Sequence, residues 1–232
     1  MPVVDLLTSS GFGSLLGMRH ALEPDHLAAV STMVSRERSS LRAAWLGLCW
    51  GIGHTTSLVV VGAVLILLRA EMPVSMTNVF ECAVGVMLVG LGIRAVVLAA
   101  QQGPDGPLTV HRHGTLVHRH AAGASHVHIG DWTLARRPLL IGMVHGLAGS
   151  GTLTALVLAT IPTAPARVAY LVLFGAGSTL SMAAMSGLLG WPLARLGTHQ
   201  AVARGVSLVV GIATMVLGVT WGYGPLLSLV GR

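Results

Sequence analysis

Residues 43–68 read AAWLGLCWGIGHTTSLVVVGAVLILL, a run that contains no Asp, Glu, Lys or Arg. A helix needs roughly 20 predominantly apolar residues to cross a bilayer, and this run is longer than that. In lipid, only helices and closed barrels satisfy every backbone polar group, and the run is too long for a barrel strand. The stretch therefore predicts a transmembrane helix.

The same pattern recurs along the chain. A span at about 77–100 carries Glu81 near one end and Arg94 near the other, where charged side chains reach the interface. With an irregular first span, the sequence predicts an all-α integral membrane protein with six transmembrane helices. Three further runs of comparable length are free of charged residues: 138–166, 168–194 and 205–231.

The first span is irregular, because the polar segment 19–26 separates the apolar residues 6–18 from the apolar residues 27–35. Pro24 lacks an amide hydrogen and frees the carbonyl of His20, so we expect the helix to kink or unwind here. We therefore predict one span that is broken at Pro24.

Composition agrees with a membrane protein. Hydrophobic residues make up 53% of the 232 residues, charged residues only 9%, and the mean hydropathy is +0.76. A soluble domain averages about 25% charged residues, so an ordinary soluble globule is excluded. All 14 basic residues are Arg and are scattered between apolar blocks, so the net charge of +6 indicates membrane orientation rather than a nucleic-acid partner.

Arginine is distributed unevenly between the predicted loops. Loops one, three and five hold nine Arg, against three on the other side. By the positive-inside rule, the odd loops are cytoplasmic and both termini lie outside. The N-terminus lacks a basic region of the signal-peptide type. We expect a multi-pass protein of a bacterial-type cytoplasmic membrane, with the bilayer as partner and a homo-oligomer left open.

The two halves of the chain resemble each other. Three spans per half is an odd number, so the halves must have opposite topology, which is the inverted-repeat plan of secondary transporters. We predict a first repeat over 1–101, a cytoplasmic loop over 102–136 and a second repeat over 137–232. Three matches at nearly constant offset carry this prediction: residues 17–22 with 142–147, residues 51–55 with 175–179, and Val84-Gly85 and Leu91-Gly92 with Val210-Gly211 and Leu217-Gly218.

The polar segment 19–26, RHALEPDH, places five ionisable residues inside a membrane span. Such residues are expensive in lipid and indicate function. Unwinding at Pro24 would let His20, Asp25 and His26 converge and bind a metal ion, since imidazole suits Ni, Co, Zn and Cu. A proton relay is the main alternative, and Arg19 and Glu23 are spaced for a simple ion pair.

Two further imidazoles lie inside predicted spans. His54 is in the second span, and His145 is the repeat mate of His20. Both could complete a site drawn from several helices, although a single His such as His145 is more often a helix–helix hydrogen bond. We expect a structural or hinge role for the residues around these ligands: Glu23, Pro24, Gly53, Gly149, Ser150 and Gly151.

The loop between the third and fourth spans holds six histidines in three His-x-His pairs. Tracts of this kind are typical of metal binding, so we predict metal capture on the cytoplasmic face. The alternative is a polar linker of biased composition. The six residues are His111, His113, His118, His120, His126 and His128.

The pattern His20-x4-Asp25-His26, with Gly53-His54-Thr55-Thr56, resembles the signatures of the nickel/cobalt transporter family, NiCoT. The resemblance implies that His20, Asp25, His26 and His54 bind and select the transported ion. Glu23-Pro24 stands where the family has Asp-Ala, and HGLAGSGT over 145–152 replaces the second-half signatures. With six spans, the chain looks more like the family's smaller urease-accessory-type and nickel/cobalt-efflux relatives, which also carry a His-rich loop.

These observations favour a secondary transporter of Ni²⁺ and/or Co²⁺ with intramembrane His and Asp ligands at the repeat interface, no prosthetic group and no enzymatic activity. A metal-handling accessory protein of the urease or hydrogenase type, or an exporter of anions or small solutes, is the alternative. A thiol–disulfide carrier would use Cys49 and Cys82, which the repeat does not pair. An intramembrane serine protease would use Ser150 with His145 as the base.

Overall fold

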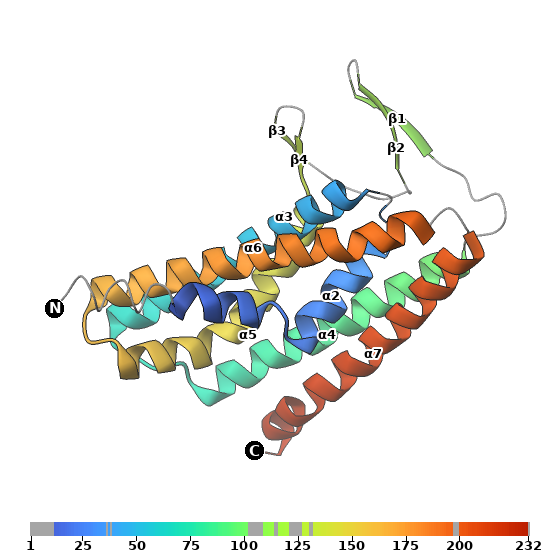
Figure 1. The fold of residues 1–232 in the computed structure, drawn as a ribbon. Coiled ribbons are helices and arrows are strands. Elements are labelled where there is room, and N and C mark those ends of the chain that lie inside the picture. The colour runs from blue at the N-terminus through green and yellow to red at the C-terminus, as the bar shows by residue number, and fades with distance from the viewer. Residues whose placement is uncertain are drawn as a thin grey trace.

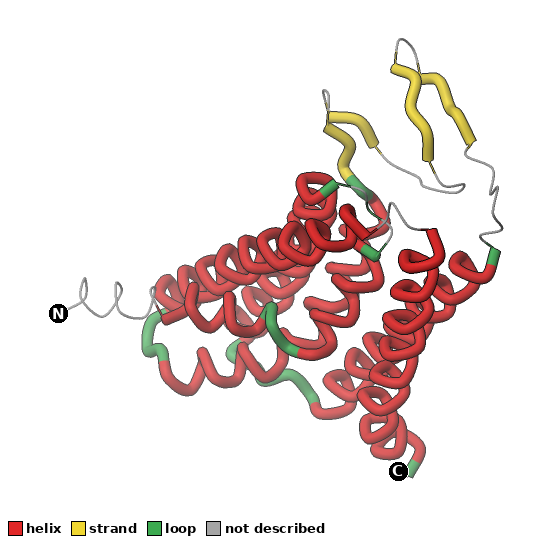
Figure 2. Tube along the Cα trace, turned by 45° about the vertical axis from the view of Figure 1, so that its right-hand side comes forward, coloured by secondary structure: helices red, strands yellow, loops and turns green. Residues whose placement is uncertain are grey.

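The computed structural model describes residues 12–35, 37, 39–101, 109–113, 116–120, 127–129, 132–196 and 200–231. Residues 12–20 form a helical segment that precedes α2. The long helices lie side by side as a bundle, and α4 and α7 form a pair that diverges from the rest (Figures 1 and 2). The remaining helices are α2 (Pro24–Val34), α3 (Ser40–Leu68), α4 (Val74–Ala100), α5 (Arg136–Thr160), α6 (Ala164–Leu196) and α7 (Gln200–Val230).

Four helices in the described part are long and apolar enough to cross a membrane. These spans cover Ser40–Leu68, Val74–Ala100, Ala164–Leu193 and Ala201–Val230, and large aliphatic side chains remain exposed along them. The chain is therefore a multi-pass membrane protein. Its other two predicted spans, the broken first span and α5, do not meet the same criterion and stay a prediction.

The first span is interrupted where the sequence predicts. The helical segment 12–20 is followed by a turn at 21–23, and α2 begins with Pro24 as its first residue. Glu23 has extended backbone angles (φ −65°, ψ 149°), as expected for a residue before proline. In the turn, the backbone amide of Glu23 donates to the carbonyl of His20 at 3.0 Å. The chain thus changes direction at the polar segment.

The central pair, α3 and α6, packs through small residues that the two halves of the sequence share. A Cβ atom at Gly51 would lie 2.7 Å from the Cα of Thr179, and a Cβ atom at Gly175 would fall on the side chain of Thr55. The Thr55 hydroxyl donates to the carbonyl of Gly175 at 2.8 Å and lies 2.8 Å from the hydroxyl of Thr179. The two contacts are reciprocal, because Gly51 and Thr55 align with Gly175 and Thr179.

The α4–α7 pair repeats this arrangement. A Cβ atom at Gly85 would lie 2.8 Å from the carbonyl oxygen of Gly218, and one at Gly218 would lie 2.7 Å from that of Gly85. Farther along the same helices, a Cβ atom at Gly211 would lie 3.0 Å from the carbonyl oxygen of Gly92. Small residues let helix backbones approach closely in lipid, where apolar burial supplies little drive.

Two short antiparallel hairpins lie in the loop between α4 and α5, outside the membrane helices (Figure 1). The first pairs Thr109 with His120 and His111 with His118, and the second pairs Val127 with Leu134. The all-α prediction holds for the membrane part and did not include these strands. They are β1 (Thr109–His113), β2 (Leu116–His120), β3 (Val127–Ile129) and β4 (Trp132–Leu134).

The glycine contacts generate a stability prediction. Gly85→Ala should lower the melting temperature in detergent, because the added methyl overlaps the α7 backbone and overpacking costs about 1–3 kcal/mol. Gly90→Ala on the same helix is the matched control, since a Cβ atom there meets nothing within 4 Å. Equal melting temperatures for the two variants would contradict close α4–α7 packing.

A candidate metal site at the helix break

The structure brings all five predicted intramembrane site residues into one cluster. His20 ends the first helical segment, Asp25 and His26 lie in the first turn of α2, His54 lies within α3, and His145 lies within α5. Four of them are almost completely buried, since His54 is 0%, His26 1%, His145 2% and Asp25 4% exposed, whereas His20 is partly exposed. Residues far apart in sequence thus meet in the interior of the bundle.

The Asp25 carboxylate organises two of the imidazoles. One oxygen, Oδ1, accepts the backbone amide of His26 at 2.9 Å and lies 2.9 Å from the Nδ1 atom of the same residue. The other oxygen, Oδ2, lies 2.7 Å from Nε2 of His145 on α5. Asp25 is one of the ligands that the sequence predicts, and in this structure both of its oxygens contact imidazole nitrogens.

Several buried imidazole nitrogens have no hydrogen-bond partner within the described part of the chain. They are Nε2 of His20, Nε2 of His26, both ring nitrogens of His54, and Nδ1 of His145. Burying a polar atom without a partner costs about 1–3 kcal/mol, so such a group of atoms indicates a missing ligand.

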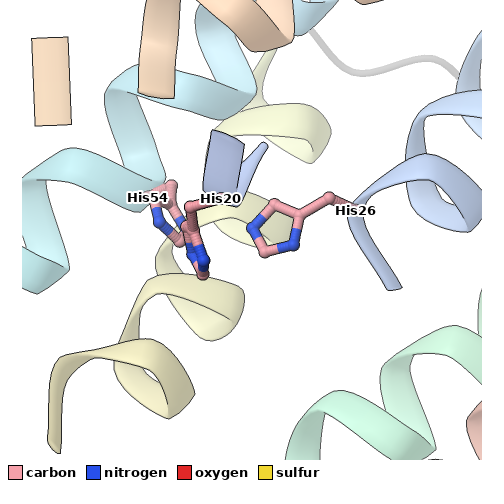
Figure 3. A group of neighbouring side chains, drawn as sticks. All are labelled: His20, His26 and His54. Atoms are coloured by element: carbon pink, nitrogen blue, oxygen red, sulfur yellow. The ribbon is translucent and has the colours of Figure 1, made fainter. Parts of the chain in front are cut away.

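Three of these side chains converge. His20, His26 and His54 each offer a ligand atom, and these atoms all lie within 4.8 Å of one another. Figure 3 shows the three side chains close together, with His54 coming from α3, His20 from the first helical segment and His26 from α2. Asp25, His26 and His145 form a second, overlapping group by the same criterion. Three or more donors at this separation can surround a single metal ion.

Aromatic rings line the cluster on two sides. The ring centroid of Trp50 lies 5.5 Å from that of His26, and the centroid of Phe174 lies 5.4 Å from that of His20. Trp50 on α3 and Phe174 on α6 are repeat mates, so the internal repeat is the signal in the sequence that relates these two rings, which were not among the predicted site residues. These rings keep the surroundings apolar, which strengthens electrostatic interactions inside the site.

The predicted hinge residues lie close to the cluster. A Cβ atom at Gly149 would lie 3.5 Å from Nε2 of His20, and one at Gly53 would overlap the backbone of Leu139 on α5. Gly53 therefore permits close approach of α3 and α5, whereas a Cβ atom at Gly149 would make only an ordinary van der Waals contact. Ser150 and Gly151 are described only as helical backbone within α5.

The side chains of the predicted loop site lie outside the described part of the structure. His126 lies outside the described residues, and the other five loop histidines are described only as backbone in β1, β2 and β3: His111, His113, His118, His120 and His128. Metal capture by the loop stays a prediction. Cys49 and Cys82 are both free cysteines, so no disulfide joins them.

Comparison with known proteins places the chain in a family. It is 31% identical over 229 residues to the urease accessory protein UreH of Bacillus sp. (strain TB-90), which covers 96% of this chain and 94% of that protein. The chain belongs to the UreH family. No protein-family profile matches the chain, and no solved structure matches it.

Two plant proteins are similar to this UreH-family chain over shorter parts of their length. The chain is 28% identical over 189 residues to the chloroplast protein FOR GROWTH AND FERTILITY 1 of Arabidopsis thaliana, and 26% identical over 188 residues to FOR GROWTH AND FERTILITY 2. The matches cover 79% and 80% of this chain but only 50% and 48% of the plant proteins. The chain therefore spans about half of their length.

The hydrogen-bond pattern generates opposite predictions for two buried residues. In metal-free protein, Asp25→Leu should lower the melting temperature, because two imidazoles lose their carboxylate acceptor. His54→Leu should leave it unchanged or raise it, because the leucine removes two buried nitrogens that have no partner. Thermal melts in detergent with a chelator measure both, and a loss in His54→Leu as large as in Asp25→Leu would contradict the assignment.

Proposed function

We propose that this protein is a secondary transporter that carries Ni²⁺ and/or Co²⁺ across the membrane. The observation that carries the proposal is the convergence of His20, His26 and His54, whose buried nitrogens lack partners. The resemblance of the first-span motif to the nickel/cobalt transporter signature supports the same cargo. In this proposal, the three imidazoles are the direct ligands.

The chemistry of the donors supports an ion of this class. Imidazole nitrogen suits Ni, Co, Zn and Cu, whereas Mg and Ca prefer oxygen ligands. Asp25 holds Nδ1 of His26 and leaves its Nε2 free, which is how a carboxylate orients a metal-binding histidine. His145 contacts the other oxygen of Asp25, so we assign Asp25 and His145 to orientation and charge compensation.

We also propose six spans arranged as two inverted repeats, over residues 1–101 and 137–232. The 25-residue helix α5 and the broken first span would be the two spans beyond the four long apolar helices. The reciprocal contacts within α3–α6 and α4–α7 support a twofold relation between the halves. In such transporters, one repeat rocks against the other around a site near the midplane.

The orientation follows from the distribution of arginine. We propose that the His-rich loop over 102–136 is cytoplasmic, that both termini lie outside, and that the loop gathers or buffers the ion on the cytoplasmic side. The name of the Bacillus relative indicates a role as a urease accessory protein. Supplying metal to such an enzyme overlaps with metal transport, and the same intramembrane site would serve it.

Ion flux tests the proposal directly. Purified protein in proteoliposomes should carry Ni²⁺ or Co²⁺, measured with a metal-sensitive dye inside the vesicles. His20→Ala, His26→Ala and His54→Ala should each reduce flux at least about tenfold, because a site with two imidazoles no longer offsets the dehydration of the ion.

The matched control is His199→Ala, because His199 is neither one of the five predicted intramembrane site residues nor one of the six histidines of the segment 111–128. Its flux should equal that of the wild type. Wild-type flux in the His26→Ala protein, or no flux of either ion through the unaltered protein, would contradict the proposal.

A further inference from the structure

A second carboxylate–imidazole pair lies at the helix break, separate from the Asp25 pairs. Oε2 of Glu23 lies 3.1 Å from Nδ1 of His20, one helical turn earlier in the chain. From the sequence, Glu23 is predicted to have a structural or hinge role, with an ion pair to Arg19 as an alternative. The salt bridges of the described residues include the His20 pair and not an Arg19–Glu23 pair.

The contact determines which ring nitrogen of His20 can bind an ion. A carboxylate accepts the proton of Nδ1–H, so the lone pair is left on Nε2. That Nε2 atom is buried without a partner, and His20 belongs to the three-imidazole group with His26 and His54. The Glu23 contact therefore presents the correct nitrogen to the site.

The backbone explains why Glu23 is available for this role. Pro24 restricts the residue before it to extended backbone angles, and Glu23 has φ −65° and ψ 149°. Within the turn, the backbone amide of Glu23 also donates a hydrogen bond to the backbone carbonyl of His20 at 3.0 Å. The backbones of the two residues are therefore held close together. A proline at position 24 thus does more than break the helix, because it fixes the residue that contacts His20.

Exposure distinguishes this pair from the rest of the cluster. The side chain of His20 is 16% exposed and that of Glu23 is 48% exposed, whereas those of His26 and His145 are 1% and 2% exposed. His20 is thus the least enclosed of the imidazoles.

We propose that Glu23 is a positioning residue that holds His20 in its metal-binding orientation and tautomer. This inference rests on the proposed function and assigns a residue beyond the three direct ligands. Glu23 acts through His20 and does not bind the ion itself. Glu23 contacts His20 and Asp25 contacts His26, so two of the three ligands are each oriented by an acidic residue of the segment 19–26.

The test measures Co²⁺ binding to the full chain in detergent, by titration and by the visible absorption of the bound ion. The six loop histidines are replaced by alanine in every protein compared, including the reference, so that the loop contributes no binding. Glu23→Ala should raise the dissociation constant about 10–100-fold, as loss of a residue that orients a metal ligand does. Glu23→Gln should have a smaller effect, because its amide oxygen still accepts from Nδ1–H. Glu81→Ala, which removes a carboxylate from α4, is the matched control and should bind as the wild type does.

A double-mutant cycle separates positioning from a direct role. In the His20→Ala background, adding Glu23→Ala should cause no further loss of affinity. A further loss of the same size would show that Glu23 acts on the ion directly and would overturn the inference, as would unchanged affinity in Glu23→Ala alone. Absence of Co²⁺ binding by the wild type would instead overturn the proposed function, so the two failures are distinguishable. Size-exclusion profiles matched to the wild type establish that the variants are folded.

Discussion

The site depends on one interaction, the contact of the Asp25 carboxylate with His26 on one side and His145 on the other. Lipid offers no water to satisfy a buried charge, so a carboxylate in this position must find its partners within the protein. Asp25 finds them on its own helix and on α5, and it thereby joins the two halves of the chain. In His26 and His145, the contact with Asp25 occupies one ring nitrogen and leaves the other without a partner.

The two halves of the chain make similar helix–helix contacts, but they contribute different numbers of residues to the cluster. Paired glycines and threonines make the same contacts in both directions across α3 and α6. His54, however, aligns with Ser178, and no second-half residue matches the acidic turn before α2. Three imidazoles and both carboxylates therefore come from the first half, and His145 is the single contribution of the second half to the cluster.

Much of this arrangement could be predicted from the sequence. Long uncharged runs predict α3, α4, α6 and α7, and Pro24 predicts the break, because each depends on local chemistry. The convergence of the five polar residues was also predictable, since isolated charges in a span need partners. The separate contacts of these residues could not be predicted. Spacing along the chain does not show that Asp25 contacts two imidazoles or that Glu23 contacts His20. The hairpins in the loop were missed, since His-rich polar segments carry no clear strand period.

The central claim is that His20, His26 and His54 together bind a transition-metal ion inside the membrane. X-ray absorption spectroscopy of the Ni²⁺-loaded protein tests it most directly, with the six loop histidines replaced by alanine so that a single site is observed. The account predicts a nitrogen-rich first shell with scattering from three imidazole rings, and one ring fewer in His26→Ala. A shell of oxygen atoms alone, or no bound nickel in the protein that retains all three histidines, would contradict it.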